Sequence, residues 1–355
     1  MLEHGGKLRE ASSQYGIPLA DWLDLSTGIN PNGWPVPAIP AATWARLPED
    51  DDGLSEAARA YYGARHTLAV AGSQAAIQAL PRLRPPCRVG VVAPGYAEHA
   101  HAWAKAGHTL IPIGRDAPPP NDLDVLVLIH PNNPTGQTYT QETLLAWHTQ
   151  LAARGGWLVI DEAFMDCTPE FSLAAHAHLP GLIVLRSLGK FFGLAGARVG
   201  FVLAEAALLE RLRDLLGPWA LNGPARHIAS LALRDAAWQA AARPKLIAAG
   251  RRLADLLTHH GLPPGGGCAL FQWLEVDGPA TGTPRAGEIH AALARRGILT
   301  RLFEAHPGAP YPQGARRFRK AAEPPTAPLP SLRFGLPGGE AGWNRLGAAM
   351  REVMA

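Results

Sequence analysis

The sequence predicts an α/β protein whose large domain holds a mixed, mostly parallel sheet, joined to a smaller α+β domain. Short apolar runs alternate with amphipathic stretches through the middle of the chain, as expected for βαβ units around a buried parallel sheet. Further along, single helices and strands follow a Gly/Pro-rich break, which indicates an α+β arrangement. We place the large domain at residues 46–235 and assign residues 1–45 and 236–355 to the small domain.

Six apolar runs are the predicted strands of the large domain, and one predicted helix has clear ends. Thr140 is a suitable N-cap for this helix, and Gly155 and Gly156 would stop it after Arg154. The predicted strands cover residues 89–92, 109–112, 124–129, 157–160, 183–186 and 198–203. In the small domain we expect a helix around 244–260, a strand at 269–276, a helix near 286–296, a strand at 298–302, a long surface loop at 305–330 and a closing helix.

Composition excludes several classes of function. The formal charge of +3 comes from basic residues scattered along the chain, which is a poor footprint for nucleic acid. No stretch approaches the roughly 18 apolar residues of a membrane span, and the N-terminus lacks the apolar core of a leader peptide. The three cysteines lie far apart without ligand spacing, so neither a metal site nor a disulfide framework is indicated. We therefore expect a soluble, cytoplasmic protein.

One of only five lysines, Lys190, lies in a glycine-rich apolar segment directly after a predicted strand. Phe191 and Phe192 follow it, and desolvation by such neighbours lowers the pKa of an amine, as Schiff-base chemistry requires. Ser187 and Arg198, at the two ends of the same segment, could bind a phosphate beside it. The alternative is an ordinary surface lysine in a glycine loop.

Polar residues also follow two other predicted strands. Asp161 comes after the strand 157–160 and could pair with a pyridinium nitrogen, although it could equally cap a turn. The strand 124–129 runs into the rigid turn His130-Pro131-Asn132-Asn133-Pro134-Thr135-Gly136, from which Asn133 can offer an amide hydrogen to a phenolic oxygen.

Two weaker signals lie earlier in the chain. Ser73 and Gln74 begin an amphipathic helix after Gly72, and a helix N-terminus suits a phosphate, although a Ser-capped helix needs no ligand. Tyr96 follows a strand and a Pro-Gly turn, where it could stack on a planar cofactor or simply pack.

Taken in order, these motifs resemble the fold-type I pyridoxal-phosphate (PLP) enzymes of the aminotransferase class I and II superfamily over nearly the whole chain. The resemblance implies an aspartate-aminotransferase-like fold, a homodimer and PLP bound by Lys190. It further implies Asp161 at the ring nitrogen, Asn133 at the ring hydroxyl and Tyr96 on the ring face. The residues it implies around the cofactor phosphate are Ser73, Gln74, Ser187 and Arg198.

Within this superfamily two activities compete: aminotransfer to histidinol phosphate, and decarboxylation of L-threonine O-3-phosphate to (R)-1-amino-2-propanol O-2-phosphate in cobalamin biosynthesis. The sequence resembles the decarboxylase more closely, because His4 and Gly5 match the His-Gly pair that meets the substrate phosphate. Phe164 and Leu47 also stand where many aminotransferases have tyrosines. The other substrate contacts that the resemblance implies are Asn30, Asn133, Arg301 and Arg333. A non-catalytic binding protein of the same fold is the remaining alternative.

Overall fold

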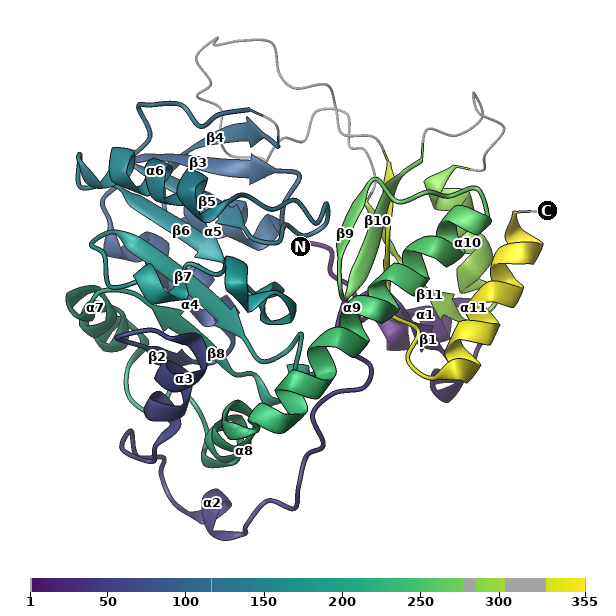
Figure 1. Cartoon of the computed structure of the whole chain (residues 1–355), viewed down its shortest axis with the longest axis horizontal. Coiled ribbons are helices and arrows are strands. Elements are labelled where there is room, and N and C mark those ends of the chain that lie inside the picture. Colours follow the sequence, from purple (N-terminus) through teal and green to yellow (C-terminus); the bar gives the residue numbers. More distant parts are fainter. Residues whose placement is uncertain (1, 116, 277–284, 304–329, 355) are drawn as a thin grey trace.

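The computed structural model describes residues 2–115, 117–276, 285–303 and 330–354. Two lobes lie side by side, and the long helix α9 (Ala236–His259) crosses from one to the other (Figure 1). The N-terminal end of the chain lies between the lobes. The expected surface loop 305–330 lies outside the described residues except for its last residue.

The larger lobe is built on a seven-stranded sheet with the order β2-β8-β7-β6-β5-β3-β4. The pairs from β7 to β4 are parallel, whereas β8 runs antiparallel to β7 and β2. The predicted mixed, mostly parallel sheet is therefore confirmed. The strands are β2 (Leu68–Val70), β3 (Arg88–Ala93), β4 (Thr109–Gly114), β5 (Val125–Ile129), β6 (Trp157–Asp161), β7 (Leu182–Ser187) and β8 (Gly200–Leu203).

Helices cover both faces of this sheet, which is why β5 and β6 are apolar without alternation and buried at every position. One face packs against α4, α5 and α7, and the other against α3, α6 and α8. These helices are α3 (Leu54–Tyr62), α4 (Ser73–Ala79), α5 (Ala97–Lys105), α6 (Gln141–Ala152), α7 (Ala206–Leu216) and α8 (Gly223–Arg234). Among the described residues, no helix is both long and apolar enough to cross a membrane.

The boundaries differ from the predicted ones in physically understandable ways. Strand β8 begins two residues later than expected because Arg198 adopts a left-handed conformation, with φ of 55°. The three-residue strand β2 was too short to predict. Helix α6 begins as expected, with the hydroxyl of Thr140 accepting the backbone N–H of Thr143. Helix α9 begins at Ala236 rather than near 244, because the carboxylate of Asp235 caps it at Trp238 N and Pro244 is accommodated inside the helix.

The smaller lobe contains a four-stranded antiparallel sheet, β12-β13-β10-β9, and a two-stranded parallel pair, β1-β11. The predicted strand 298–302 is divided between the two sheets, because Thr300 separates β11 from β12. The strands are β1 (Leu23–Asp24), β9 (Gly266–Cys268), β10 (Phe271–Glu275), β11 (Ile298–Leu299), β12 (Arg301–Phe303) and β13 (Ser331–Gly335). The helices are α1 (Leu8–Tyr15), α10 (Ala286–Ala294) and α11 (Glu340–Val353), with the short helix α2 (Ala42–Ala45) lying by the larger lobe.

A buried ionic cluster anchors the ends of β6 and β7. The guanidinium of Arg186 donates to Glu162 Oε2 and to Asp166 Oδ1, both at 2.5 Å, and lies 4.6 Å above the ring of Tyr62. All three charged side chains are at most 2% exposed. Because Glu162 directly follows the end of β6 and Arg186 lies at the end of β7, the cluster ties these two strand ends together.

Replacing Arg186 by Met should destabilise the fold severely, because two buried carboxylates would lose their cation. We expect a loss of about 3 kcal/mol or more in the free energy of unfolding at neutral pH, measured by urea denaturation. The loss should shrink as the pH falls toward about 5, because burial raises the pKa of Glu162 and its protonation in the folded variant removes one of the two uncompensated charges. Arg59→Met, which breaks the exposed Arg59–Glu56 pair in α3, is the control and should cost less than about 1 kcal/mol. Equal losses in both variants would contradict this account.

Candidate active site

Lys190 lies in the loop after β7, where its amine is surrounded by apolar groups and other charges. Its Nζ makes a long contact of 3.5 Å with the carbonyl of Thr27 and lies 5.4 Å from the ring centre of Phe164. Burial, together with the nearby cation Arg333, lowers the pKa of Lys190 to about 8, while the Asp161 carboxylate opposes the shift. An amine with this pKa is partly neutral near pH 7, so it can act as a nucleophile.

Asp161, the last residue of β6, is buried and held from two sides. Its Oδ2 lies 2.9 Å from Nε2 of His99 in α5, and its Oδ1 accepts the backbone N–H of Ala163 at 3.1 Å. Because an ionised carboxylate can only accept, the Nε2 of His99 carries the hydrogen in this pair. The imidazole and the backbone N–H therefore fix the orientation of the carboxylate.

Three of the predicted phosphate-binding residues come together where β7, β8 and the start of α4 meet. Ser187 is the register partner of Gly200, and a Cβ added at Gly200 would lie 2.4 Å from the backbone nitrogen of Ser73. The guanidinium of Arg198 lies against Gly72, where an added Cβ would approach Nη2 to 2.6 Å. The two glycines thus allow a hydroxyl, a helix N-terminus and an exposed cation to converge, which suits an anion.

Gln74 and Tyr96 lie beside this group but are bound to other residues. The amide of Gln74 donates to Glu98 Oε2 at 2.6 Å, and the hydroxyl of Tyr96 makes a long contact of 3.4 Å with Gln74 Oε1. Burial, together with the negative charge of Glu98, raises the pKa of Tyr96 to about 12, so its hydroxyl stays protonated. The ring of Tyr96 also lies near that of His99, with centroids 6.4 Å apart.

Arg333, in β13, faces the turn that follows β5. Its guanidinium donates to Asn133 Oδ1 and to the carbonyl of Ser26, both at 2.5 Å, and it lies 5.2 Å above the ring of Phe271. Its buried Nε has no hydrogen-bond partner among the described residues. Burial lowers the pKa of Arg333 to about 10, helped by the charge of Arg301, and the group therefore stays cationic at neutral pH.

Arg301 and the N-terminal segment lie next to this arginine. Arg301 is the register partner of Arg333, and its guanidinium donates to the carbonyl of Glu3 at 2.8 Å. The next residue, His4, contacts Glu98 rather than Arg301, with its Nε2 lying 2.8 Å from Oε1 of the carboxylate. Gly5 passes so close to the carbonyl of Ser26 that an added Cβ would lie 2.4 Å from it. The structure thus brings the predicted N-terminal residues to the pocket, with His4 facing α5.

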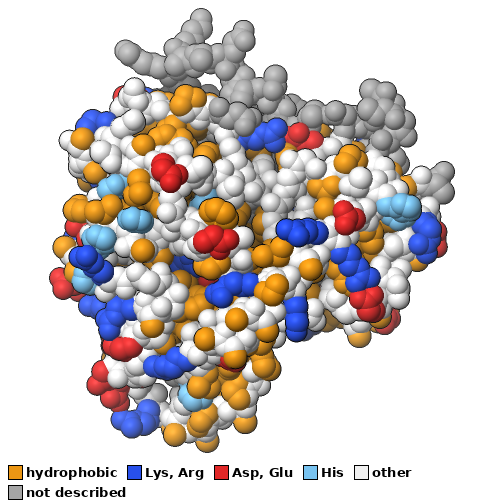
Figure 2. All heavy atoms as spheres, in the orientation of Figure 1, with side chains coloured by type: hydrophobic (Ala, Val, Ile, Leu, Met, Phe, Trp, Pro, Cys, Tyr) orange, Lys and Arg blue, Asp and Glu red, His pale blue; other side chains and the backbone are white. Residues whose placement is uncertain are grey.

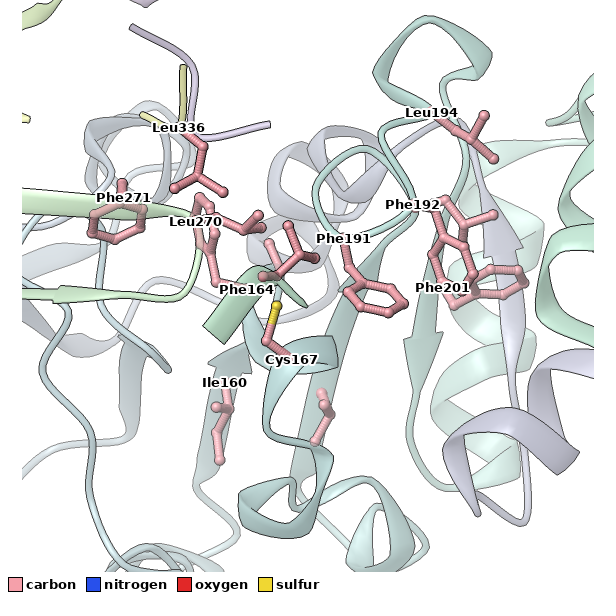
Figure 3. Close-up of a cluster of buried hydrophobic side chains, with 14 of the residues drawn as sticks. Ile160, Phe164, Cys167, Phe191, Phe192, Leu194, Phe201, Leu270, Phe271 and Leu336 are labelled. Atoms are coloured by element: carbon pink, nitrogen blue, oxygen red, sulfur yellow. The ribbon is translucent and has the colours of Figure 1, made fainter. Parts of the chain in front are cut away.

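Asn30 also reaches the pocket, but its side chain faces the backbone of the lysine segment. Its Nδ2 donates to the carbonyl of Phe191 at 2.8 Å. Aromatic side chains surround this region: Phe164, Phe271, Phe191 and Phe192 form a continuous buried cluster that joins the two lobes (Figure 3). This cluster provides the apolar surroundings that lower the pKa of the lysine.

Sequence reasoning missed His99 and Glu98, which hold Asp161 and His4. Both are buried polar residues in the first turn of α5, two and three residues after Tyr96. Their position two and three residues after a candidate cofactor residue was the available signal, because it brings them to the same helix end. Thr27, whose carbonyl faces Lys190, acts through its backbone and leaves no signal of this kind.

Comparisons with known proteins agree with this arrangement. The family model "Aminotransferase class I and II" matches residues 47–305. The chain is 57% identical over 352 residues to a threonine-phosphate decarboxylase of Pseudomonas aeruginosa, covering 99% of this chain and 97% of that protein. It is 40% identical over 337 residues to a threonine-phosphate decarboxylase of Sinorhizobium sp, covering 90% and 97% of the two chains.

A solved structure shares the fold. The histidinol-phosphate aminotransferase of Sinorhizobium meliloti, determined in complex with pyridoxal-5'-phosphate, matches with a TM-score of 0.79 at 19% identity. The match covers 99% of this chain and 95% of that one. At this low sequence identity, the similarity shows only that the two proteins share a fold.

The lowered pKa of Lys190 predicts an unusual reactivity. At pH 7 an amine with a pKa of about 8 is roughly 10% neutral, whereas an unperturbed lysine with a pKa of about 10.4 is about 0.04% neutral. Brief labelling of the ligand-free protein with a small acylating reagent, followed by peptide mass spectrometry, should therefore modify Lys190 along a pH profile with a midpoint near 8. The exposed Lys245 is the reference. If both lysines followed the same profile, the pocket would not perturb the amine.

Proposed function

The chain belongs to the aminotransferase class I and II family, and we propose that it is a PLP-dependent carboxy-lyase that decarboxylates L-threonine O-3-phosphate to (R)-1-amino-2-propanol O-2-phosphate. The identity of 57% to the Pseudomonas decarboxylase, over nearly the full length of both chains, is the observation that carries this proposal. The product suggests a role in cobalamin biosynthesis. The combination of a lysine of lowered pKa, a buried aspartate and two arginines in one pocket makes a purely binding role the weaker alternative.

The residues of the pocket fit PLP. Lys190 supplies a weakly contacted amine of lowered pKa for the aldehyde, and Asp161 supplies a buried carboxylate for the ring nitrogen. Ser73, Ser187 and Arg198 surround the position that suits the cofactor phosphate. When bound, PLP supplies an electron sink for negative charge at the substrate Cα. His99 would maintain the charge that keeps the ring nitrogen protonated, by holding the carboxylate of Asp161 in place.

The cationic groups around the pocket suit a substrate with two anionic groups. Arg333 lies deep in the pocket with an unpartnered Nε and suits the α-carboxylate, whose two oxygens match a guanidinium. Arg301 contacts the N-terminal segment at Glu3, next to His4, and these two side chains suit the phosphate. Asn133, bound to Arg333, would help to hold both the arginine and the ring.

The reaction requires the bond from Cα to the carboxylate to break and a proton to be added at Cα. Arg333 would orient that bond, and Lys190, once released from the cofactor, is the group able to deliver the proton. Phe164 lies below the lysine where many aminotransferases have a tyrosine, so no hydroxyl from this position contacts the cofactor ring. A bound cofactor ring would therefore lack a tyrosine contact that is common in aminotransferases, which favours the decarboxylase.

The direct test incubates the PLP-loaded protein with threonine phosphate and, separately, with histidinol phosphate plus 2-oxoglutarate. We expect CO2 release in the first reaction and little glutamate in the second. Lys190→Ala should abolish both CO2 release and the visible absorbance of the lysine-bound cofactor, because the amine that binds and that returns the proton is lost. Rapid glutamate formation without CO2 would establish the aminotransferase instead.

The proposed phosphate contacts predict a selective loss of specificity. His4→Ala or Arg301→Ala should lower kcat/KM for threonine phosphate about tenfold or more, because a hydrogen bond to a charged group is worth ~1.5–3 kcal/mol. Unphosphorylated threonine should be affected little, and the cofactor spectrum should not change. His66→Ala and Arg295→Ala, at exposed positions, are the matched controls. If kcat/KM fell equally for both substrates, these residues would instead support the fold or the binding of the cofactor.

The larger lobe carries an exposed apolar surface that we propose is covered by a second copy of the chain. A groove of about 630 Å³ separates residues 42–52 from α8. Leu47 and Leu231 line this groove together with several charged side chains, and Leu47 is 66% exposed. Trp44, in the neighbouring helix α2, is 68% exposed. Figure 2 shows hydrophobic side chains gathered at this end of the molecule. Large apolar side chains exposed close together, with charged residues around them, are typical of subunit contacts.

Placing a charge on this surface should therefore weaken the homodimer. Leu47→Glu should increase the dissociation constant at least about tenfold in analytical ultracentrifugation, because a carboxylate would be buried without a partner. Leu19→Glu introduces the same charge at another exposed apolar position, 41% exposed in the short helical turn before β1, and is the control. A wild-type protein that stays monomeric and fully active would refute the proposal.

A further inference from the structure

We propose that residues 26–34, here called the clamp segment, set the position of Lys190 relative to Arg333, and that Asn30 and Gly33 are positioning residues for the lysine. This inference rests on the proposed function, because it assumes that Lys190 binds the cofactor. It assigns Asn30 a role other than the substrate contact implied by the family resemblance.

The clamp segment binds the backbone of the lysine loop, residues 190–193, at three consecutive carbonyls. The backbone N–H of Asn30 donates to the carbonyl of Lys190 at 3.0 Å, and its side-chain Nδ2 donates to that of Phe191 at 2.8 Å. The backbone N–H of Trp34 donates to the carbonyl of Phe192 at 2.8 Å. Three successive carbonyls fixed from one side leave the loop little freedom to shift along the segment.

Close contact between two glycines brings these backbones together. A Cβ at Gly33 would lie 2.8 Å from the carbonyl oxygen of Phe192 and 3.1 Å from the Cα of Gly193. A Cβ at Gly193 would lie 2.7 Å from the Cα of Gly33. Because backbone atoms rather than flexible side chains occupy this space, any side chain at Gly33 must push the lysine loop away.

The other end of the clamp segment holds the arginine. The carbonyl of Ser26 accepts from Nη2 of Arg333 at 2.5 Å, and the carbonyl of the next residue, Thr27, faces Nζ of Lys190 at 3.5 Å. Just before the segment, the carbonyl of Leu25 accepts the backbone N–H of Gly335 at 2.7 Å and so ties the chain to β13. A single short stretch of backbone therefore contacts both cations of the pocket.

Asn30 is suited to position the lysine loop because both the nitrogen and the oxygen of its side-chain amide make hydrogen bonds. While Nδ2 donates to Phe191, Oδ1 accepts the backbone N–H of Asn32 at 2.9 Å, and the residue is 3% exposed. Its side chain thus fixes the local turn and the loop together. Since the substrate amine must replace Lys190 while Arg333 holds the carboxylate, the spacing set by the clamp segment decides how the substrate Cα is presented.

The test compares Gly33→Ala with Gly196→Ala in the PLP-loaded protein. An added Cβ at Gly196, in the same lysine-bearing segment, meets no atom within 4 Å, so this variant is the matched control. Asn30→Ala is the second variant, and circular dichroism confirms that each protein folds. Two properties are measured: the pH titration of the visible cofactor band without substrate, and kcat and KM for threonine phosphate.

We expect Gly33→Ala and Asn30→Ala to shift the substrate-free titration by about half a pH unit or more and to lower kcat about tenfold, with KM changed less than about threefold. Gly196→Ala should resemble the unsubstituted protein. The proposal is overturned if Gly33→Ala behaves like Gly196→Ala, or if Asn30→Ala raises KM alone and leaves the titration unchanged, since Asn30 would then contact only the substrate. A missing visible band in the unsubstituted protein would reject the proposed function as well.

Discussion

The burial of two cations in one pocket, Lys190 and Arg333, is the constraint on which the rest of the site depends. Burial lowers the pKa of both groups, but only that of Lys190, at about 8, falls close to neutrality, whereas that of Arg333 stays at about 10. The pocket therefore holds an amine, Lys190, that is partly neutral near pH 7, and a guanidinium, Arg333, that stays charged. Asp161 opposes the shift at the lysine, while Asn133 and the carbonyl of Ser26 satisfy the arginine.

The parallel sheet explains why these groups meet. Asp161, Asn133 and Lys190 each follow the carboxyl end of a different strand, and adjacent parallel strands end at the same edge. The smaller lobe adds Arg333 from β13, and the N-terminal chain passes between the lobes to contact both. The site therefore lies where the two lobes join, and its residues come from stretches far apart in the sequence.

The sequence predicted those parts of the molecule that depend on local pattern. Buried apolar runs identified β3 to β7, and the polar residues after them made Asp161, Asn133 and Lys190 candidates one by one. That they share one site was implied by the family resemblance. The sequence could not predict His99, whose role depends on how α5 packs over the sheet, nor the carbonyl contacts of Ser26 and Thr27, which any residue type could make. Helix α9 was predicted too short because proline is common at the first position of a helix, whereas Pro244 lies inside this one.

Helix α9 also connects the lysine loop to the smaller lobe. Its first turns pack on the lysine loop, where Trp238 contacts the rings of Phe191 and Phe192, while its other end lies in the smaller lobe. A helix of 24 residues is ~36 Å long, so a tilt of about 5° about its near end displaces the far end by ~3 Å. A displacement of this size would break the contact between Arg333 of β13 and Asn133 of the larger lobe, so the packing of Trp238 on the lysine loop helps to hold the two lobes in place.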